Sequence, residues 1–125
     1  MAKILLVDDE ESIRLLYSEE LKEEGYEVAL ASDGRDLIRR IEEESPDVVV
    51  LDIKIKDLNG LDLLQEVRKK FYNLPVILCS AYTSFKGELK TYAADDYVVK
   101  SSDLTELKHK IKRVLEGHIP SELKE

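Results

Sequence analysis

The sequence has few of the residues that form covalent or metal cross-links. It contains one cysteine, Cys79, no tryptophan and two histidines, His109 and His118, among 125 residues. A single cysteine excludes an internal disulfide and fits a reducing compartment, so we expect the protein in the cytoplasm. The histidines come late in the chain and form no cluster with Cys79, which argues against a structural zinc site.

Long apolar runs and positive charge are also scarce. No segment approaches the roughly 18 apolar residues of a membrane span, and the first residues lead directly into a strand-like stretch, leaving no room for a signal peptide. Lys and Arg number 19 against 27 Asp and Glu, which gives a formal charge of −8. This charge argues against direct nucleic-acid binding, and the lack of a dense basic run argues against binding to an anionic membrane.

Apolar runs of strand length alternate with stretches of helical periodicity. The strand-like runs are residues 4–7, 26–31, 48–51, 76–79 and 97–99. Unbroken aliphatic runs are typical of parallel strands covered on both faces. Helical spacing predicts helices near residues 13–21, 37–41, 64–71, 83–92 and 104–115. The alternation predicts a single α/β domain, a (βα)5 three-layer sandwich with a five-stranded parallel sheet.

Two local signals refine this prediction. Phe85 and Leu89 alone support the helix near residues 83–92, which makes it the weakest of the five. Asp103 and Glu106 have the spacing of a capping box and predict the start of the last helix.

Polar residues with ligand or phosphate chemistry follow four of the five predicted strands. These residues are Asp8, Asp9 and Glu10, then Asp52, then Ser80, then Lys100. Each alone has an ordinary explanation as a helix cap, a turn residue or a solvated charge. Together they lie where ligands bind in open α/β sheets, and carboxylates that converge there repel one another unless a cation is present. Oxygen ligands without a Cys/His cluster favour a hard ion such as Mg²⁺.

In order along the chain, these motifs resemble the receiver domain of two-component response regulators over nearly the whole length. The residues that carry the resemblance are Val7-Asp8-Asp9-Glu10, Leu51-Asp52, Asn59-Gly60, Ser80-Ala81 and Asp95-Asp96-Tyr97-Val98-Val99-Lys100. The resemblance implies the flavodoxin-like strand order 2-1-3-4-5, which places Asp8 and Asp9 beside Asp52. We expect the receiver domain to span residues 1–117. The residues after the last predicted helix, 118–125, are expected to form a C-terminal tail and no output domain.

By this resemblance, Asp52 accepts a phosphoryl group from a sensor histidine kinase or a phosphotransfer protein. Asp9 and Asp52 ligate Mg²⁺ directly (Mn²⁺ is an alternative ion), Asp8 does so through water, and the Lys54 backbone carbonyl completes the protein ligands. Lys100 contacts a phosphoryl oxygen as a point charge, and the Ser80 hydroxyl donates to another. Such a protein is a phosphoacceptor that promotes its own phosphorylation and slow dephosphorylation, rather than an enzyme.

The resemblance assigns further roles to the switch and to the lifetime of the acyl phosphate. Ser80 and Tyr97 are the switch pair: Ser80 moves toward the phosphoryl group, Tyr97 turns inward, and the surface of the fourth helix, fifth strand and fifth helix changes its affinity for partners. Lys54 and Tyr82, each two residues beyond a site residue, flank the path of hydrolytic water. Both are bulky, which leads to the hypothesis that they slow hydrolysis.

The sequence departs from the family at three points. Ser101 follows Lys100 where a proline is usual in the family. That proline commonly forms a cis peptide bond that directs the lysine side chain, so this means of orienting Lys100 is missing here. Residues 53–57 lack the common Met-Pro pair, although Asn59-Gly60 can supply a turn. The stretch between Ser80 and Lys100 is roughly two residues shorter than usual, which predicts a short or irregular fourth helix.

Three other classes of protein compete with this interpretation. A flavodoxin-type carrier needs a Ser/Thr/Gly-rich phosphate loop after the first strand, where this chain has carboxylates that repel a flavin phosphate. An aspartyl phosphatase usually places its nucleophile after the first strand and needs a cap over the substrate. A degenerate receiver that serves only as a docking module is the third alternative, and Mg²⁺-dependent phosphorylation would exclude it. The sequence leaves open whether the chain is a stand-alone relay or adaptor, or part of a longer regulator.

Overall fold

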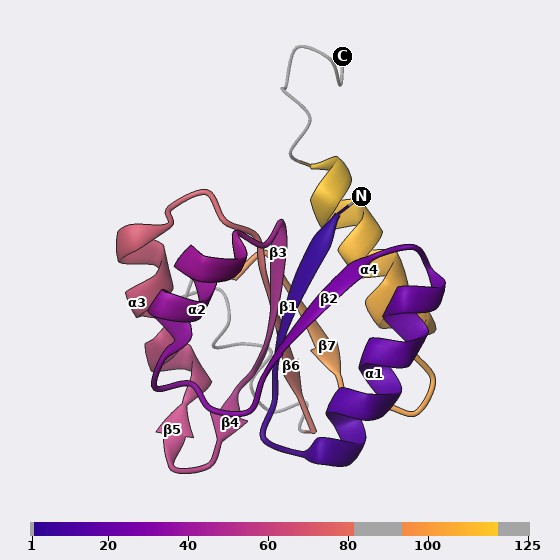
Figure 1. The fold of residues 1–125 in the computed structure, drawn as a ribbon, viewed down its shortest axis with the longest axis horizontal. Helices are drawn as coiled ribbons and strands as arrows, with labels where there is room; N and C mark the ends of the chain where they lie inside the picture. The colour runs from indigo at the N-terminus through magenta and orange to yellow at the C-terminus, as the bar shows by residue number, and fades with distance from the viewer. Residues whose placement is uncertain (1, 82–93, 118–125) are drawn as a thin grey trace.

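The computed structural model describes residues 2–81 and 94–117, and they form a central parallel sheet between two layers of helices (Figure 1). The elements in chain order are β1 (Lys3–Val7), α1 (Glu11–Glu23), β2 (Glu27–Ala31), α2 (Leu37–Glu44), β3 (Val48–Asp52), β4 (Lys54–Ile55), β5 (Leu58–Asn59), α3 (Gly60–Lys70), β6 (Val76–Ser80), β7 (Asp96–Val99) and α4 (Thr105–Glu116). The helix predicted near residues 83–92 and the tail over 118–125 lie outside the described residues.

The sheet has the predicted order and direction. Its strands run β2-β1-β3-β6-β7, and every neighbouring pair is parallel. All five residues of β3 and of β6 are buried, whereas β2 and β7 are the sheet edges and are partly exposed. The (βα)5 sandwich is confirmed for its five strands and for the four helices within the described residues.

Alternation along the strands divides the apolar side chains into two clusters, one on each face of the sheet. On β3, Val49 and Leu51 pack with α2 and α3, while Val48 and Val50 pack with α1 and α4. Figure 1 shows the same division, with α1 and α4 on one side of the sheet and α2 and α3 on the other. The sheet is therefore buried on both faces, as its aliphatic composition predicts.

A short antiparallel hairpin between β3 and α3 was not predicted. β4 pairs with β5, and Lys56 takes the left-handed conformation at the turn, with a φ of 56°. The prediction of a turn at Asn59-Gly60 was wrong: the Asn59 side chain accepts a hydrogen bond from the Leu61 N–H at 2.8 Å and caps α3, and Gly60 is the first residue of that helix. An Asn-Gly pair is therefore used here to begin a helix.

The predicted capping box at the last helix was also wrong. Leu104 is the N-cap of α4, and no side chain caps the helix there. Asp103 lies one residue earlier, where its carboxylate accepts hydrogen bonds from the Thr105 N–H at 3.0 Å and the Thr105 hydroxyl at 2.6 Å. Because Thr105 is the first residue of α4, Asp103 satisfies an N–H at the start of the helix from one position before the N-cap. Among the described helices, none has the length and apolar character to cross a membrane.

Candidate functional site

The carboxyl ends of the central strands bring three of the predicted site residues into direct contact. Lys100 Nζ lies 2.8 Å from Asp8 Oδ2 and 3.0 Å from Asp52 Oδ2. These residues follow or end β7, β1 and β3, and the parallel arrangement places those ends at one edge of the sheet. Asp8 and Asp52 are 2% and 5% exposed, so their carboxylates are held in a shielded environment.

Glu10 is a site residue that the sequence interpretation did not assign to a role. Its carboxylate lies 3.3 Å from Lys100 Nζ, although the side chain itself is exposed. One carboxylate oxygen from each of Asp8, Asp9 and Glu10 lies within 4.8 Å of the other two. The position of Glu10 directly after the Asp8-Asp9 pair in the sequence could have indicated that it belongs to the site. Three oxygen ligands this close are a donor set that suits a hard divalent cation.

Hydrogen bonds orient the acidic side chains. The Asp8 carboxylate accepts from the Glu10 N–H at 2.9 Å, and Asp52 Oδ1 accepts from the Lys54 N–H at 3.2 Å. Asp9 Oδ2 accepts from the Lys56 N–H at 2.8 Å, so the β4–β5 hairpin is bonded to this carboxylate. Each acid is thus held by the backbone of a neighbouring segment, which limits its rotamers.

The group of side chains around Lys100 holds more negative than positive charge, because the carboxylates of Asp8, Glu10 and Asp52 face one ammonium group. Burial raises the pKa of the Asp52 carboxyl, and Lys100 opposes this rise while Asp8 adds to it. For Lys100, burial alone would lower the pKa, but hydrogen bonds to Asp8 and Asp52 outweigh that effect and raise it. Lys100 is therefore a permanent cation, and it faces more carboxylates than it can neutralise. A divalent cation would supply the charge that is lacking.

Ser80, at the end of β6, and Tyr97, on β7, are joined to each other. Their side chains are 2% and 5% exposed, and a hydrogen bond links the two hydroxyl groups. Burial raises the pKa of Tyr97, and the bond to Ser80 opposes this rise. Ser80 also accepts a hydrogen bond from the Lys100 N–H through its carbonyl oxygen, at 2.7 Å. Tyr97 is thus already directed inward in this structure.

The structure describes one of the two residues predicted to tune the lifetime of the acyl phosphate. Lys54 lies on β4 and is exposed. Tyr82 lies outside the described residues, and the role of both stays a prediction.

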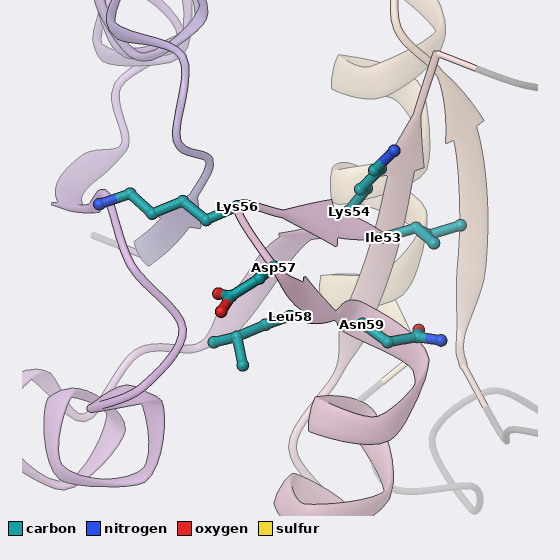
Figure 2. A pocket seen from close by; sticks show the side chains of 6 residues that line it. All are labelled: Ile53, Lys54, Lys56, Asp57, Leu58 and Asn59. Carbon is teal, nitrogen blue, oxygen red and sulfur yellow. The ribbon is translucent and has the colours of Figure 1, made fainter.

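A cavity of about 300 Å³ lies against the hairpin, lined by Ile53, Lys54, Lys56, Asp57, Leu58 and Asn59 (Figure 2). Figure 2 shows the Lys54 and Lys56 side chains pointing away from each other. None of the acidic cluster residues lines this cavity. It is therefore a neighbour of the site, separate from the cluster of Asp8, Asp52 and Lys100.

The fold and this edge define a doubly wound α/β protein with a lysine-bridged carboxylate site at the carboxyl ends of its strands. The family model for the response regulator receiver domain matches residues 4–112. The chain belongs to the receiver domains of response regulators.

Solved structures of this family are similar to the chain. The response regulator TrrA from Thermotoga maritima, in complex with Mg²⁺-BeF, is 43% identical with a TM-score of 0.86, over 91% of this chain and 99% of that one. TrrA bound to the histidine kinase ThkA matches at 43% identity and a TM-score of 0.84, over 92% and 99%. A CheY-like receiver domain from Methanospirillum hungatei is 30% identical with a TM-score of 0.86, over 94% and 95%.

Proposed function

We propose that the protein is a phosphorylation switch that accepts a phosphoryl group on Asp52 in a Mg²⁺-dependent reaction. The contact of Lys100 with both Asp52 and Asp8 is the observation that carries this proposal. It brings an acceptor carboxylate, a second acid and a fixed cation to one point at the sheet edge. That combination suits a reaction between two negatively charged groups.

The metal site is proposed from its donor set. Asp9 and Asp52 would bind Mg²⁺ directly, Asp8 through water, and the Lys54 carbonyl would complete the protein ligands, with Glu10 close enough to share in the charge. When bound, the ion neutralises charge on the acceptor and on the incoming group. The binding of Mg²⁺-BeF by TrrA, at 43% identity, supports this assignment.

In the proposed reaction, the Asp52 carboxylate attacks the phosphorus of a phosphohistidine on the donor. The new bond joins an Asp52 oxygen to phosphorus, the phosphorus–nitrogen bond breaks, and the released imidazole takes a proton from solvent. The Lys100 ammonium group would exchange a carboxylate partner for a phosphoryl oxygen. The Ser80 hydroxyl would donate a hydrogen bond to a second phosphoryl oxygen. Both groups already lie at this edge of the sheet, but each has to exchange a present partner for the phosphoryl group: Lys100 a carboxylate, and Ser80 the Tyr97 hydroxyl.

The switch would act through the Ser80–Tyr97 pair. If the Ser80 hydroxyl donates to a phosphoryl oxygen, its hydrogen bond with Tyr97 must be rearranged. Tyr97 lies on the edge strand β7, and its side chain packs on the α2 and α3 face of the sheet. A change at its hydroxyl would therefore be transmitted to the surface beside β7 on that face, where partners would bind. Lys54 and Tyr82 would shield the acyl phosphate from water, and small residues at both positions should speed dephosphorylation.

A sensor histidine kinase is the proposed phosphoryl donor, supported by the complex of TrrA with ThkA. The protein would then act as a phosphoacceptor within residues 1–117, and not as an enzyme that turns over a separate substrate. The second candidate function is a docking module that binds partners without being phosphorylated. The complete set of Asp8, Asp9, Asp52, Ser80 and Lys100 favours the switch.

Intact mass spectrometry after incubation with acetyl phosphate tests the proposal. A gain of one phosphoryl group is expected only with Mg²⁺ present, and the Asp52→Asn variant is expected to gain none. A chain that stays unmodified and fails to bind Mg²⁺ would support the docking module. A gain that persists in Asp52→Asn would place the acceptor elsewhere.

A further inference from the structure

Ser101 occupies the position where the family usually has proline, and the structure contains a different constraint on this segment. The hydroxyl group of Tyr17, on α1, donates a hydrogen bond to the Ser101 carbonyl oxygen at 2.9 Å. The same hydroxyl accepts one from the Ser101 N–H at 3.2 Å. One side chain therefore holds both backbone polar groups, the N–H and the carbonyl, of the residue that directly follows Lys100.

The backbone on the other side of Lys100 is held as well. The Lys100 N–H donates to the Ser80 carbonyl at 2.7 Å, which continues the pairing of β7 with β6. Within the described residues no peptide bond is cis, so the segment after Lys100 runs through an ordinary trans backbone. The bonds to Ser80 and Tyr17 together fix the backbone from which the Lys100 side chain extends toward Asp8 and Asp52.

Tyr17 is well placed to act as a rigid support. Its side chain is 2% exposed and packs in the cluster of α1 and α4. Burial raises the pKa of the phenol, so it stays protonated and keeps its donor at neutral pH. Cys79, one residue before Ser80, packs in the same cluster. The phenol thus joins α1 to the segment between β7 and α4.

The Ser101 side chain explains why a proline would not fit this arrangement. Its hydroxyl accepts a hydrogen bond from the Asp103 N–H at 3.1 Å, which begins the turn into α4. Proline would remove that hydroxyl as well as the N–H that donates to Tyr17. Serine at position 101 and tyrosine at position 17 therefore work as a pair.

We propose that Tyr17 is a positioning residue that aims Lys100 into the acidic site by holding the backbone of Ser101. The inference rests on the proposed role of Lys100 in phosphorylation. A tyrosine that only filled the core would need one partner for its hydroxyl, whereas Tyr17 binds both the N–H and the carbonyl of the residue next to Lys100.

The test compares Tyr17→Phe, which keeps the buried ring and removes the hydroxyl, with Tyr26→Phe. Tyr26 is half-buried in the same cluster but precedes β2, at the opposite edge of the sheet. With acetyl phosphate and Mg²⁺, Tyr17→Phe is expected to slow phosphorylation about 3- to 10-fold, the factor that one hydrogen bond commonly carries. Tyr26→Phe is expected to react at the rate of the unaltered protein.

A second readout separates positioning from a general loss of stability. The ¹H–¹³C signals of Lys100 Cε, assigned with a Lys100→Met variant, are expected to shift in Tyr17→Phe and to stay in place in Tyr26→Phe. Equal rates for Tyr17→Phe and the unaltered protein, or a slower rate with unmoved Lys100 signals, would overturn the inference alone. If the unaltered protein is never phosphorylated, both the inference and the proposed function fail.

Discussion

Replacing Gly60 with alanine should destabilise the protein through a backbone contact. A Cβ at this position would lie 2.6 Å from Ile53 Cα and 2.9 Å from the Ile53 carbonyl oxygen, and closer still to the Asp52 carbonyl oxygen. Ordinary carbon–carbon contacts are about 3.5–4.0 Å, so atoms must move by about 1 Å. The opposing atoms belong to the backbone and not to a flexible side chain, so α3 or the end of β3 has to shift.

The expected cost is about 2–3 kcal/mol in free energy of unfolding. Forcing extra atoms into a packed region costs about 1–3 kcal/mol, and the hydrogen bond from the Gly60 N–H to the Ile53 carbonyl is weakened as well. The better helix propensity of alanine offsets at most about 1 kcal/mol of this. For a domain of this size, the loss lowers the midpoint of thermal unfolding by about 8–12 °C.

Thermal unfolding followed by circular dichroism measures this effect, with Gly25→Ala as the matched control. Gly25 has a φ of +96° and no atom within 4 Å of a Cβ, so alanine there is strained without touching a neighbour. Both variants should lose stability, but only Gly60→Ala should also slow phosphorylation of Asp52, because only it displaces the acceptor backbone. An unchanged midpoint or an unchanged phosphorylation rate in Gly60→Ala would refute the reasoning.

Two further predictions concern metal and pH. Mg²⁺ at ten times its dissociation constant should raise the free energy of unfolding by about 1.4 kcal/mol, because the ion binds only the folded state. Thermal unfolding with and without Mg²⁺ at constant ionic strength measures this gain. A similar gain in Asp9→Asn would contradict the proposed metal site. Burial raises the pKa of Cys79 to about 12, so the folded state favours the neutral thiol. The stability that the folded state gains by keeping this thiol neutral is fully present below the pKa of the unfolded chain, near 9. It is lost as the pH rises from there toward 12, where the free energy of unfolding falls by up to about 1.4 kcal/mol per pH unit. Urea unfolding between pH 8.5 and about 11 should therefore show a steeper loss in the unaltered protein than in Cys79→Ala, and parallel slopes would argue against it.

The central strands were predictable because a strand buried on both faces has an unbroken run of aliphatic residues in the sequence. Every residue of the run at 48–51 is buried in β3. The order of the strands could not be predicted in the same way, because crossovers between distant segments decide which strands are neighbours. The correct order was taken from the resemblance to receiver domains and not from a local pattern.

The site was predictable where a residue directly follows a strand, as Asp8 and Lys100 do. Contacts made by backbone groups were not, because they depend on loop conformation: the Lys56 N–H meets Asp9 only through a hairpin two residues long on each side. Tyr17 gave no signal either. Its spacing predicts an apolar helix face, and that says nothing of the hydroxyl at its far end.

The division of the apolar side chains by the sheet has a consequence for how this protein can change in evolution. Substitutions at Ile41, on the α2 and α3 face, and at Ile111, on the α4 face, share no packing partners. Effects at sites without shared partners usually add. Each helical layer can therefore be altered, and compensated, without requiring changes in the other. A lineage can remodel one outer surface while inheriting the opposite layer and the acidic edge intact.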